Sequence, residues 1–132
     1  MWNRLRAELD EKGYGVYAVE LKSSGSLIGL LGFHWADFKA DFTPCVEIGW
    51  RLVPEAWGHG YATEGARACL EHGFARLGLD RVYSFTACVN LPSQAVMQRA
   101  GMRKTAEFNH PKVAPDSVLY PHVLYVREAS HA

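Results

Sequence analysis

Residues 46–63, VEIGWRLVPEAWGHGYAT, constrain the fold of this chain more than any other segment. They predict a β-strand, a short turn and then a loop with Gly58 and Gly60 that leads directly into a helix. The first amides of a helix have no intrahelical acceptor, and they lie at the positive end of the helix dipole. Bare glycine backbone at that point predicts a phosphate-binding turn.

Two well-known phosphate loops fit this segment poorly. A Walker loop ends in Gly-Lys-Ser/Thr because its lysine reaches the terminal phosphates, whereas residues 61–63 here are YAT. A dinucleotide fingerprint fits Gly58 and Gly60 but has Thr63 in place of its third glycine. Asp80 stands about twenty residues beyond the loop, as a ribose-binding acid would. Because strand-like runs precede the segment, a dinucleotide-binding protein is only a weak alternative.

Composition and charge indicate one globular domain over residues 1–132. Lys plus Arg and Asp plus Glu both number 14, and no basic run occurs, so we expect no nucleic-acid partner. The number of cysteines is odd, and the three, Cys45, Cys69 and Cys88, are widely spaced. This pattern favours three buried thiols in a reducing cytoplasm over a disulfide framework. Neither a signal peptide nor a membrane-spanning run is apparent, so we expect a cytoplasmic protein without a membrane partner.

Hydrophobic alternation predicts three strands before the loop, at residues 14–21, 27–35 and 45–53, and residues 3–12 predict a short helical fragment. The helix after the loop has one stripe of apolar and small residues, namely Ala62, Ala66, Cys69, Leu70, Gly73, Phe74 and Leu77. Arg67 and Glu71 on its other face form an expected i,i+4 pair. Gly78 predicts its end.

The remaining elements follow the same logic. Residues 81–87 predict a strand, Pro92 stands in the first turn of a second helix that Gly101 ends, and residues 104–108 and 118–127 predict two final strands. The order is strand, strand, strand, helix, strand, helix, strand, strand. It predicts an α+β fold with a mixed sheet.

Two blocks of this chain resemble the GNAT superfamily of N-acetyltransferases, in particular its RimJ/RimL branch. Residues 48–52 (IGWRL) and 57–64 (WGHGYATE) resemble the strand I-G-[YW]-x-[LV] and the acetyl-CoA loop W-G-x-G-Y-A-T-E of that branch. Trp57 replaces the Gln or Arg that is usual elsewhere in the superfamily. Residues 90–93 (NLPS) and 99–102 (RAGM) resemble its N-x-x-S…K-x-G-[FM] motif. The resemblance extends to tail segments at residues 107–111 and 122–125.

The resemblance implies a GNAT-like acyl-CoA N-acyltransferase fold, with a central mixed sheet flanked by helices. Family members usually begin with one more strand and a helix, and we expect these to be missing here. Residues 14–21 would then form an edge strand, and an unprotected edge tends to recruit another strand. We therefore expect a homodimer through this edge, or cover from the N-terminal helical fragment.

The resemblance also implies that acetyl-CoA is the co-substrate. The backbone of the strand end would pair with the pantetheine arm, and the loop amides would surround the pyrophosphate. Asn90 would order the loop or contact the pantetheine, although a plain turn asparagine is the alternative. At His59, the backbone is expected to matter more for cofactor binding than the imidazole ring. The predicted cofactor-binding residues are Trp50, Arg51, Leu52, Gly58, His59, Gly60, Tyr61, Ala62, Thr63 and Asn90.

Two residues are candidates for catalysis. Much of the superfamily uses a tyrosine at the position of Met97 as proton donor, and methionine cannot donate, so the resemblance implies Ser93 instead; the alternative is that Ser93 only caps the helix. Glu47 is the candidate general base, because desolvation in an apolar strand could raise its pKa. The alternative is a solvent-facing glutamate, with Glu107 as a second candidate base.

The reaction implied is acetyl transfer to a primary amine, by direct attack in a ternary complex. The acceptor would be the α-amine of a protein or peptide, or a small amine. His110 and His122 lack the short spacing of a metal site, so no metal is expected. A non-catalytic acyl-CoA-binding domain is the alternative function.

Overall fold

The computed structural model describes residues 5–9, 15–21 and 23–129, with side chains from Tyr17 onward. The strands are β1 Leu5–Leu9, β2 Gly15–Glu20, β3 Leu27–Ala36, β4 Cys45–Leu52, β5 Arg81–Ala87, β6 Arg103–Asn109 and β7 Pro121–Glu128. The helices are the short 3-10 turn η1 Pro54–Ala56, then α1 Tyr61–Arg76 and α2 Leu91–Arg99.

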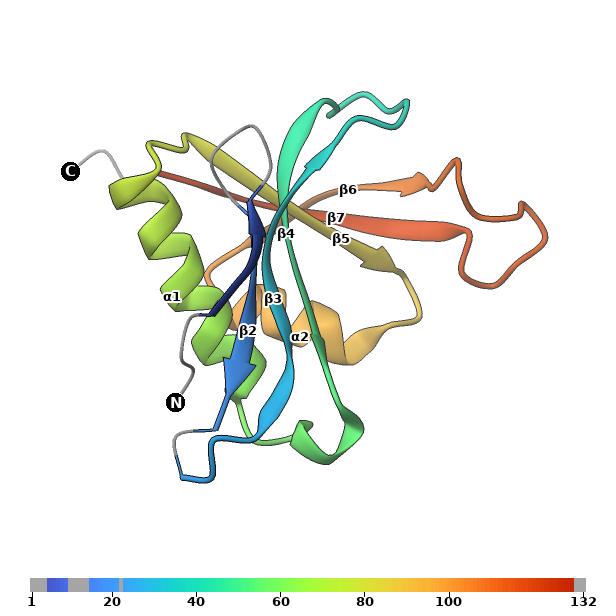
Figure 1. The fold of residues 1–132 in the computed structure, drawn as a ribbon. Coiled ribbons are helices and arrows are strands. Elements are labelled where there is room, and N and C mark those ends of the chain that lie inside the picture. Colours follow the sequence, from blue (N-terminus) through green and yellow to red (C-terminus); the bar gives the residue numbers. More distant parts are fainter. Residues whose placement is uncertain (1–4, 10–14, 22, 130–132) are drawn as a thin grey trace.

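The seven strands of the described residues form one sheet in the order β1-β2-β3-β4-β5-β7-β6. Neighbouring strands are antiparallel except β4 and β5, which are parallel and are connected through α1. In Figure 1, β2, β3 and β4 run steeply while β5, β6 and β7 cross them at a wide angle. This is the predicted α+β fold with a mixed sheet, and the one parallel pair among the described strands differs from the parallel sheet of a dinucleotide-binding fold.

The N-terminal part differs from the prediction. The expected helical fragment at residues 3–12 is wrong for residues 5–9, which form β1 and pair antiparallel with β2; the rest of that fragment lies outside the described residues. The sequence LRAEL alternates apolar and polar residues, so it suits a strand as well as a helix. It forms a strand here because the edge of β2 offers backbone hydrogen-bond partners. The expectation that residues 14–21 form an edge strand is therefore also wrong, because β1 lies outside β2.

Helix α1 packs closely on β3, and small residues on its inner face allow this. Its buried residues are Gly65, Ala66, Cys69, Leu70 and Gly73, most of them in the predicted stripe. A Cβ at Gly65 would come 2.8 Å from Leu31 Cδ1, and one at Gly73 would come 2.7 Å from Phe33 Cζ. Larger residues at these two positions would push the helix off the sheet, so the two glycines hold α1 close to β3.

The parallel strands β4 and β5 separate soon after they meet. Within the described chain, the facing residues that pair between them are Glu47 and Tyr83. Just beyond this pair, the buried Ser84 hydroxyl donates to the carbonyl of Ile48 at 2.9 Å. From there to its end, β4 has β3 as a neighbour on one side and an open edge on the other.

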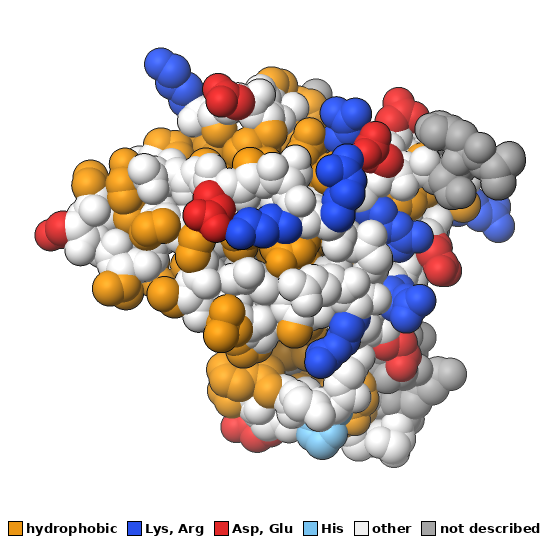
Figure 2. Space-filling view, turned by 180° about the vertical axis from the view of Figure 1, so that it is seen from behind, with side chains coloured by type: hydrophobic (Ala, Val, Ile, Leu, Met, Phe, Trp, Pro, Cys, Tyr) orange, Lys and Arg blue, Asp and Glu red, His pale blue; other side chains and the backbone are white. Residues whose placement is uncertain are grey.

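The surface carries both charge signs. Figure 2 shows Lys and Arg side chains interspersed with Asp and Glu on the face in view. Among the described residues, neither helix has the length and apolar character that crossing a membrane requires.

Candidate active site

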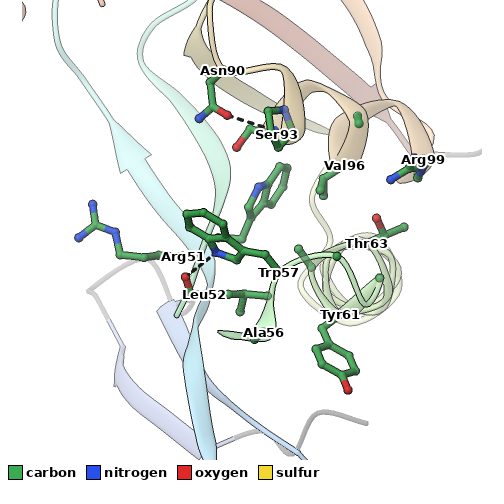
Figure 3. A pocket seen from close by; sticks show the side chains of 16 residues that line it. Arg51, Leu52, Ala56, Trp57, Tyr61, Thr63, Asn90, Ser93, Val96 and Arg99 are labelled. Carbon is green, nitrogen blue, oxygen red and sulfur yellow. Dashed lines mark hydrogen bonds between the residues drawn. The ribbon is translucent and has the colours of Figure 1, made fainter. Parts of the chain in front are cut away.

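A cavity of about 700 Å³ lies between the end of β4, the start of α1 and helix α2 (Figure 3). This volume is typical of a small-molecule site. The cavity brings together Ser93 and every predicted cofactor-binding residue except His59. The ring of His59 stacks on Tyr61 at a centroid distance of 5.2 Å and is not among the lining groups.

The start of α1 presents free backbone donors to this cavity. The first intrahelical bond runs from Glu64 N–H to the Gly60 carbonyl at 3.0 Å, so the amides of residues 61–63 have no acceptor within the helix. In the described chain no side chain caps this helix start. Gly58 and Gly60 have φ of +80° and +78°, values that favour glycine. The arrangement suits an anion such as a phosphate group.

The open edge of β4 faces the same cavity. Val53 N–H donates to the carbonyl of Ile28 in β3 at 2.8 Å. Peptide groups alternate in direction along a strand, so those of Trp50 and Leu52 point away from β3, toward the cavity. The indole Nε1–H of Trp57 donates to the Leu52 carbonyl at 2.9 Å (Figure 3). The N–H and C=O of Trp50 remain for an extended amide-containing ligand.

At the start of α2, Asn90 is the cap. Its Oδ1 accepts a hydrogen bond from the Ser93 backbone N–H at 3.3 Å. The alternative in which Ser93 itself caps the helix is therefore wrong. The Ser93 hydroxyl lines the cavity and has no hydrogen-bond partner among the described residues. Met97, at the position where the superfamily often has its tyrosine, is 1% exposed in the core and does not line the cavity.

Glu47 lies on the opposite face of the sheet. Ile48 is fully buried in the core with the helices, and side chains alternate along a strand, so Glu47 points the other way. It faces His34 across β3 and Tyr83 across β5. Burial raises its pKa to about 7. The pKa of neighbouring Cys45 is raised to about 11, mainly because the thiol is buried and to a smaller extent because of the nearby Glu47 charge.

An aromatic cluster lies on the same face of the sheet as Glu47. Phe38 and Phe42, from the loop between β3 and β4, pack against rings of β5 and β6. Phe42 is 5.6 Å from Tyr83, the residue that pairs with Glu47, and 5.0 Å from Phe108. The loop between β3 and β4 therefore covers part of the sheet face on which Glu47 lies.

Three other candidates lie outside the cavity. Glu107, the second candidate base, is exposed and its Oε2 accepts from Lys104 Nζ at 2.8 Å. His110 and His122, distant in sequence, have ring centroids 5.0 Å apart. No group of three or more metal-ligating side chains occurs in the described part of the chain.

Sequence reasoning assigned no role to several cavity residues, of which Trp57 and Arg99 matter most. Trp57 stood in the loop motif, but only the structure reveals that its indole ties the loop to β4. Arg99 stood in the second motif block, at the position of its Lys. Nothing local in the sequence indicates that the end of α2 reaches the start of α1, which is where the cavity places Arg99.

Comparison with known proteins agrees with this geometry. Residues 1–103 match the family described as the acetyltransferase (GNAT) domain. The match covers well over half of the chain, so the protein belongs to this family, as its two motif blocks predicted.

Two relatives and one solved structure illustrate the similarity. The uncharacterized N-acetyltransferase YnaD of Bacillus subtilis is 36% identical over 92 residues, which cover 70% of this chain and 52% of YnaD. The FsC-acetyl coenzyme A-N(2)-transacetylase of Aspergillus fumigatus is 41% identical over 71 residues, or 54% of this chain and 29% of that protein. A GNAT-family acetyltransferase structure from Bacillus anthracis has 31% identity and a TM-score of 0.69, covering 86% of this chain and 65% of that one. The chain thus spans about half or less of the length of these two relatives.

Proposed function

We propose that this protein is an acetyl-CoA-dependent N-acetyltransferase, which transfers an acetyl group to a primary amine by direct attack in a ternary complex. The observation that carries the proposal is the uncapped start of α1, which opens into the same cavity as the Ser93 hydroxyl. Family membership supports the acetyl donor. The name of the fungal relative includes both acetyl coenzyme A and an N(2)-transacetylase activity.

The cavity offers one group for each part of the donor. The amides of residues 61–63 would hold the pyrophosphate, as helix starts do. The peptide group of Trp50 on the open edge of β4 would pair with the pantetheine amides, in the manner of an added strand. Ser93 then lies at the thioester end, with Asn90 holding its backbone in place.

The proposed mechanism has two proton transfers, one to Glu47 on the far face of the sheet and one from Ser93 on the cavity side. A neutral amine attacks the thioester carbonyl, and Glu47 accepts the proton that the amine loses. The carbon–sulfur bond breaks as the amide forms, and Ser93 delivers a proton to the departing thiolate. A pKa of about 7 suits Glu47 to this role, since a general base works best near the ambient pH.

The separation of β4 and β5 offers a way for Glu47 to take part from the far face. It belongs to the pair at which these strands last face each other, and the open edge of β4 begins beyond it. An amine that approaches from the Glu47 face would meet the thioester at this opening.

The acceptor and the setting complete the proposal. The RimJ/RimL-like motifs favour the α-amine of a protein or peptide, and a small amine is the alternative. Balanced charge argues against a nucleic-acid partner.

The cysteines Cys45, Cys69 and Cys88 are all free thiols, which favours a cytoplasmic location. Cys88 is half-buried rather than buried as expected. A homodimer remains part of the proposal, though not through an edge at β2.

A ligand comparison tests the function. Acetyl-CoA at one hundred times its Kd should add about 2.7 kcal/mol to the free energy of unfolding, or roughly 10 °C in Tm, while NAD should add nothing. Release of free CoA thiol should then be measured across a panel of peptides, polyamines and amino acids. Stabilisation without turnover on any amine would favour the non-catalytic alternative, and stabilisation by NAD alone would refute the proposal.

A further inference from the structure

Gly49, in the middle of β4, is a glycine that the described packing does not require. Its φ is not in the left-handed region. A Cβ at this position would come 3.8 Å from Cδ2 and 3.9 Å from Nε2 of His34, which are ordinary van der Waals contacts. Gly65 and Gly73, by contrast, leave no room for a Cβ. A glycine inside a strand weakens the strand and often marks a place where a ligand approaches the backbone closely.

The position of Gly49 fits such an approach. It lies on the far face of the sheet, opposite the two helices, because the preceding Ile48 is buried in the core on the helix side. It follows Glu47 and Tyr83, the pair at which β4 and β5 last face each other. Gly49 is partly exposed, and its partner on β3 is Gly32, so this pair places no side chain on the far face. The bare backbone therefore lies where the proposed reaction needs the acceptor amine.

Side chains of opposite charge stand on either side of this glycine. Glu47, Gly49 and Arg51 alternate along β4, so all three lie on the far face. Four residues of strand separate the Cα atoms of Glu47 and Arg51 by about 13 Å. Arg51 borders the cavity, but Figure 3 shows its side chain pointing away from Ser93 and Asn90. Its guanidinium group is therefore available on the acceptor side rather than the cofactor side.

Both charged groups lack a partner in the described part of the chain. Arg51 is exposed, and neither it nor Glu47 forms a side-chain hydrogen bond or ion pair with another described residue. A guanidinium group binds a carboxylate through two parallel hydrogen bonds. A carboxylate at one end of a bare stretch and a free guanidinium at the other end complement a ligand that carries both an amine and a carboxylate.

These charges also separate the acceptors that the proposed function leaves open. A polyamine that placed one amine beside Glu47 would bring its next ammonium group toward Arg51, and like charges repel. An amino acid, or a peptide with an acidic group near its N-terminus, would bring a carboxylate to the same place. The charge pattern of β4 therefore favours acidic acceptors over cationic ones.

We propose that the acceptor is a primary amine that carries a carboxylate, with its amine over Gly49 beside Glu47 and its carboxylate bound by Arg51. This inference rests on the proposed function and specifies the substrate class for the same reaction. It makes Gly49 the residue that gives the acceptor room and Arg51 the residue that selects its charge.

Three unbranched amines test the charge preference. n-Butylamine, 4-aminobutyrate and putrescine differ at the end remote from the reacting amine, where they carry a methyl group, a carboxylate and an ammonium group. With acetyl-CoA and the full chain, release of CoA thiol gives kcat/KM for each amine. The value for 4-aminobutyrate should exceed that for n-butylamine about five- to tenfold, a modest ratio because Arg51 is exposed. Putrescine should be the poorest of the three.

Variants of Arg51 test whether this residue causes the preference. In Arg51→Gln, the ratio of 4-aminobutyrate to n-butylamine should fall to about one, and Arg51→Lys should restore part of it because the charge returns. Both acceptors are compared on the same variant, so any effect on the cofactor cancels in the ratio. Arg76→Gln, the matched control in the last turn of α1, should keep the parent ratio.

Gly49→Ala tests the room for the acceptor. The added methyl group should lower kcat/KM for all three amines about tenfold, because it occupies space that the acceptor needs. The Kd of acetyl-CoA should stay within about twofold of the parent. The Tm should not fall, since alanine suits a strand interior better than glycine. These two measurements distinguish a blocked acceptor site from a damaged fold.

The outcomes separate this inference from the proposed function. Turnover of other amines without a preference for 4-aminobutyrate, a preference that survives in Arg51→Gln, or full turnover by Gly49→Ala would each overturn the inference and leave the acetyltransferase proposal standing. Binding of acetyl-CoA without turnover of any amine would overturn both.

Discussion

The two helices that border the cavity begin in opposite ways. Helix α2 starts at a capped position, where Asn90 accepts a hydrogen bond from Ser93 N–H and Pro92 occupies the first turn. Helix α1 starts at Gly60 in a left-handed conformation, with no side-chain cap among the described residues. A missing cap costs about 1 kcal/mol. The difference supports the proposal that α2 positions the Ser93 side chain while the free amides of α1 bind the cofactor.

The largest effect should come from closing the start of α1. Gly60→Asp adds a carboxylate beside the free amides and forces a side chain onto a φ of +78°. We expect acetyl-CoA affinity to fall roughly a hundredfold or more, because the new charge repels the pyrophosphate. Titration calorimetry would measure the Kd.

Gly60→Asn is the matched control for that change. It has the same shape without the charge, and asparagine tolerates this conformation better than most residues. We expect it to retain most of the affinity. Near-parent binding by Gly60→Asp would contradict a phosphate site at this helix start.

Glu47, on the sheet face opposite the two helices, is a carboxylate whose burial should make the stability of the protein depend on pH. Its pKa of about 7 lies above the usual 4.5 because of burial. Below about pH 4.5 both folded and unfolded states hold the proton; between that pH and about 7 only the folded state holds it, so the free energy of unfolding falls as pH rises. The total loss should be about 3 kcal/mol.

The variant Glu47→Gln tests both the pH dependence of stability and the catalytic role of Glu47. The variant should lack the loss of stability between pH 4.5 and 7 in urea unfolding, and its kcat/KM should lose the limb with a midpoint near pH 7. A stability change without a change in the pH–rate profile would make Glu47 a buried structural carboxylate and leave the base role to water.

A smaller effect should follow at the capped helix. Ser93→Ala removes a hydroxyl but keeps the backbone N–H that Asn90 caps, so α2 should form normally. We expect kcat to fall about a hundredfold, the lower end of the usual effect of losing a proton donor, with the acetyl-CoA Kd within about twofold. An unchanged kcat in single-turnover measurements, with chemistry limiting, would remove Ser93 from the mechanism.

The smallest effect should come from the cap itself. Asn90→Ala should lower the free energy of unfolding by about 1 kcal/mol, read as a lower urea midpoint with an unchanged slope. Asn90→Asp keeps the acceptor and should retain most of that stability. A loss in Asn90→Asp equal to that in Asn90→Ala would argue against capping as the role of this residue.

Sequence reasoning succeeded where neighbouring residues decide the outcome. The strand at residues 81–87, the stop at Gly78 just beyond the end of α1, and the loop glycines follow from alternation and from backbone conformations that glycine favours. It failed at residues 5–9, where a pattern compatible with a helix pairs with β2 instead. It also left open whether Ser93 caps α2 and did not identify Asn90 as the cap, because both residue types are good caps and only the geometry of the turn selects Asn90.

The sequence by itself determined the family, the order of the strands and helices from residue 15 onward, and the glycine loop at the start of α1, because these depend on local periodicity and backbone freedom. The tertiary structure decided which face Glu47 occupies and that it lies opposite Tyr83, a residue against which Phe42 packs. It also decided that Arg99 ends beside the start of α1. These contacts join segments distant along the chain, and no local pattern encodes them.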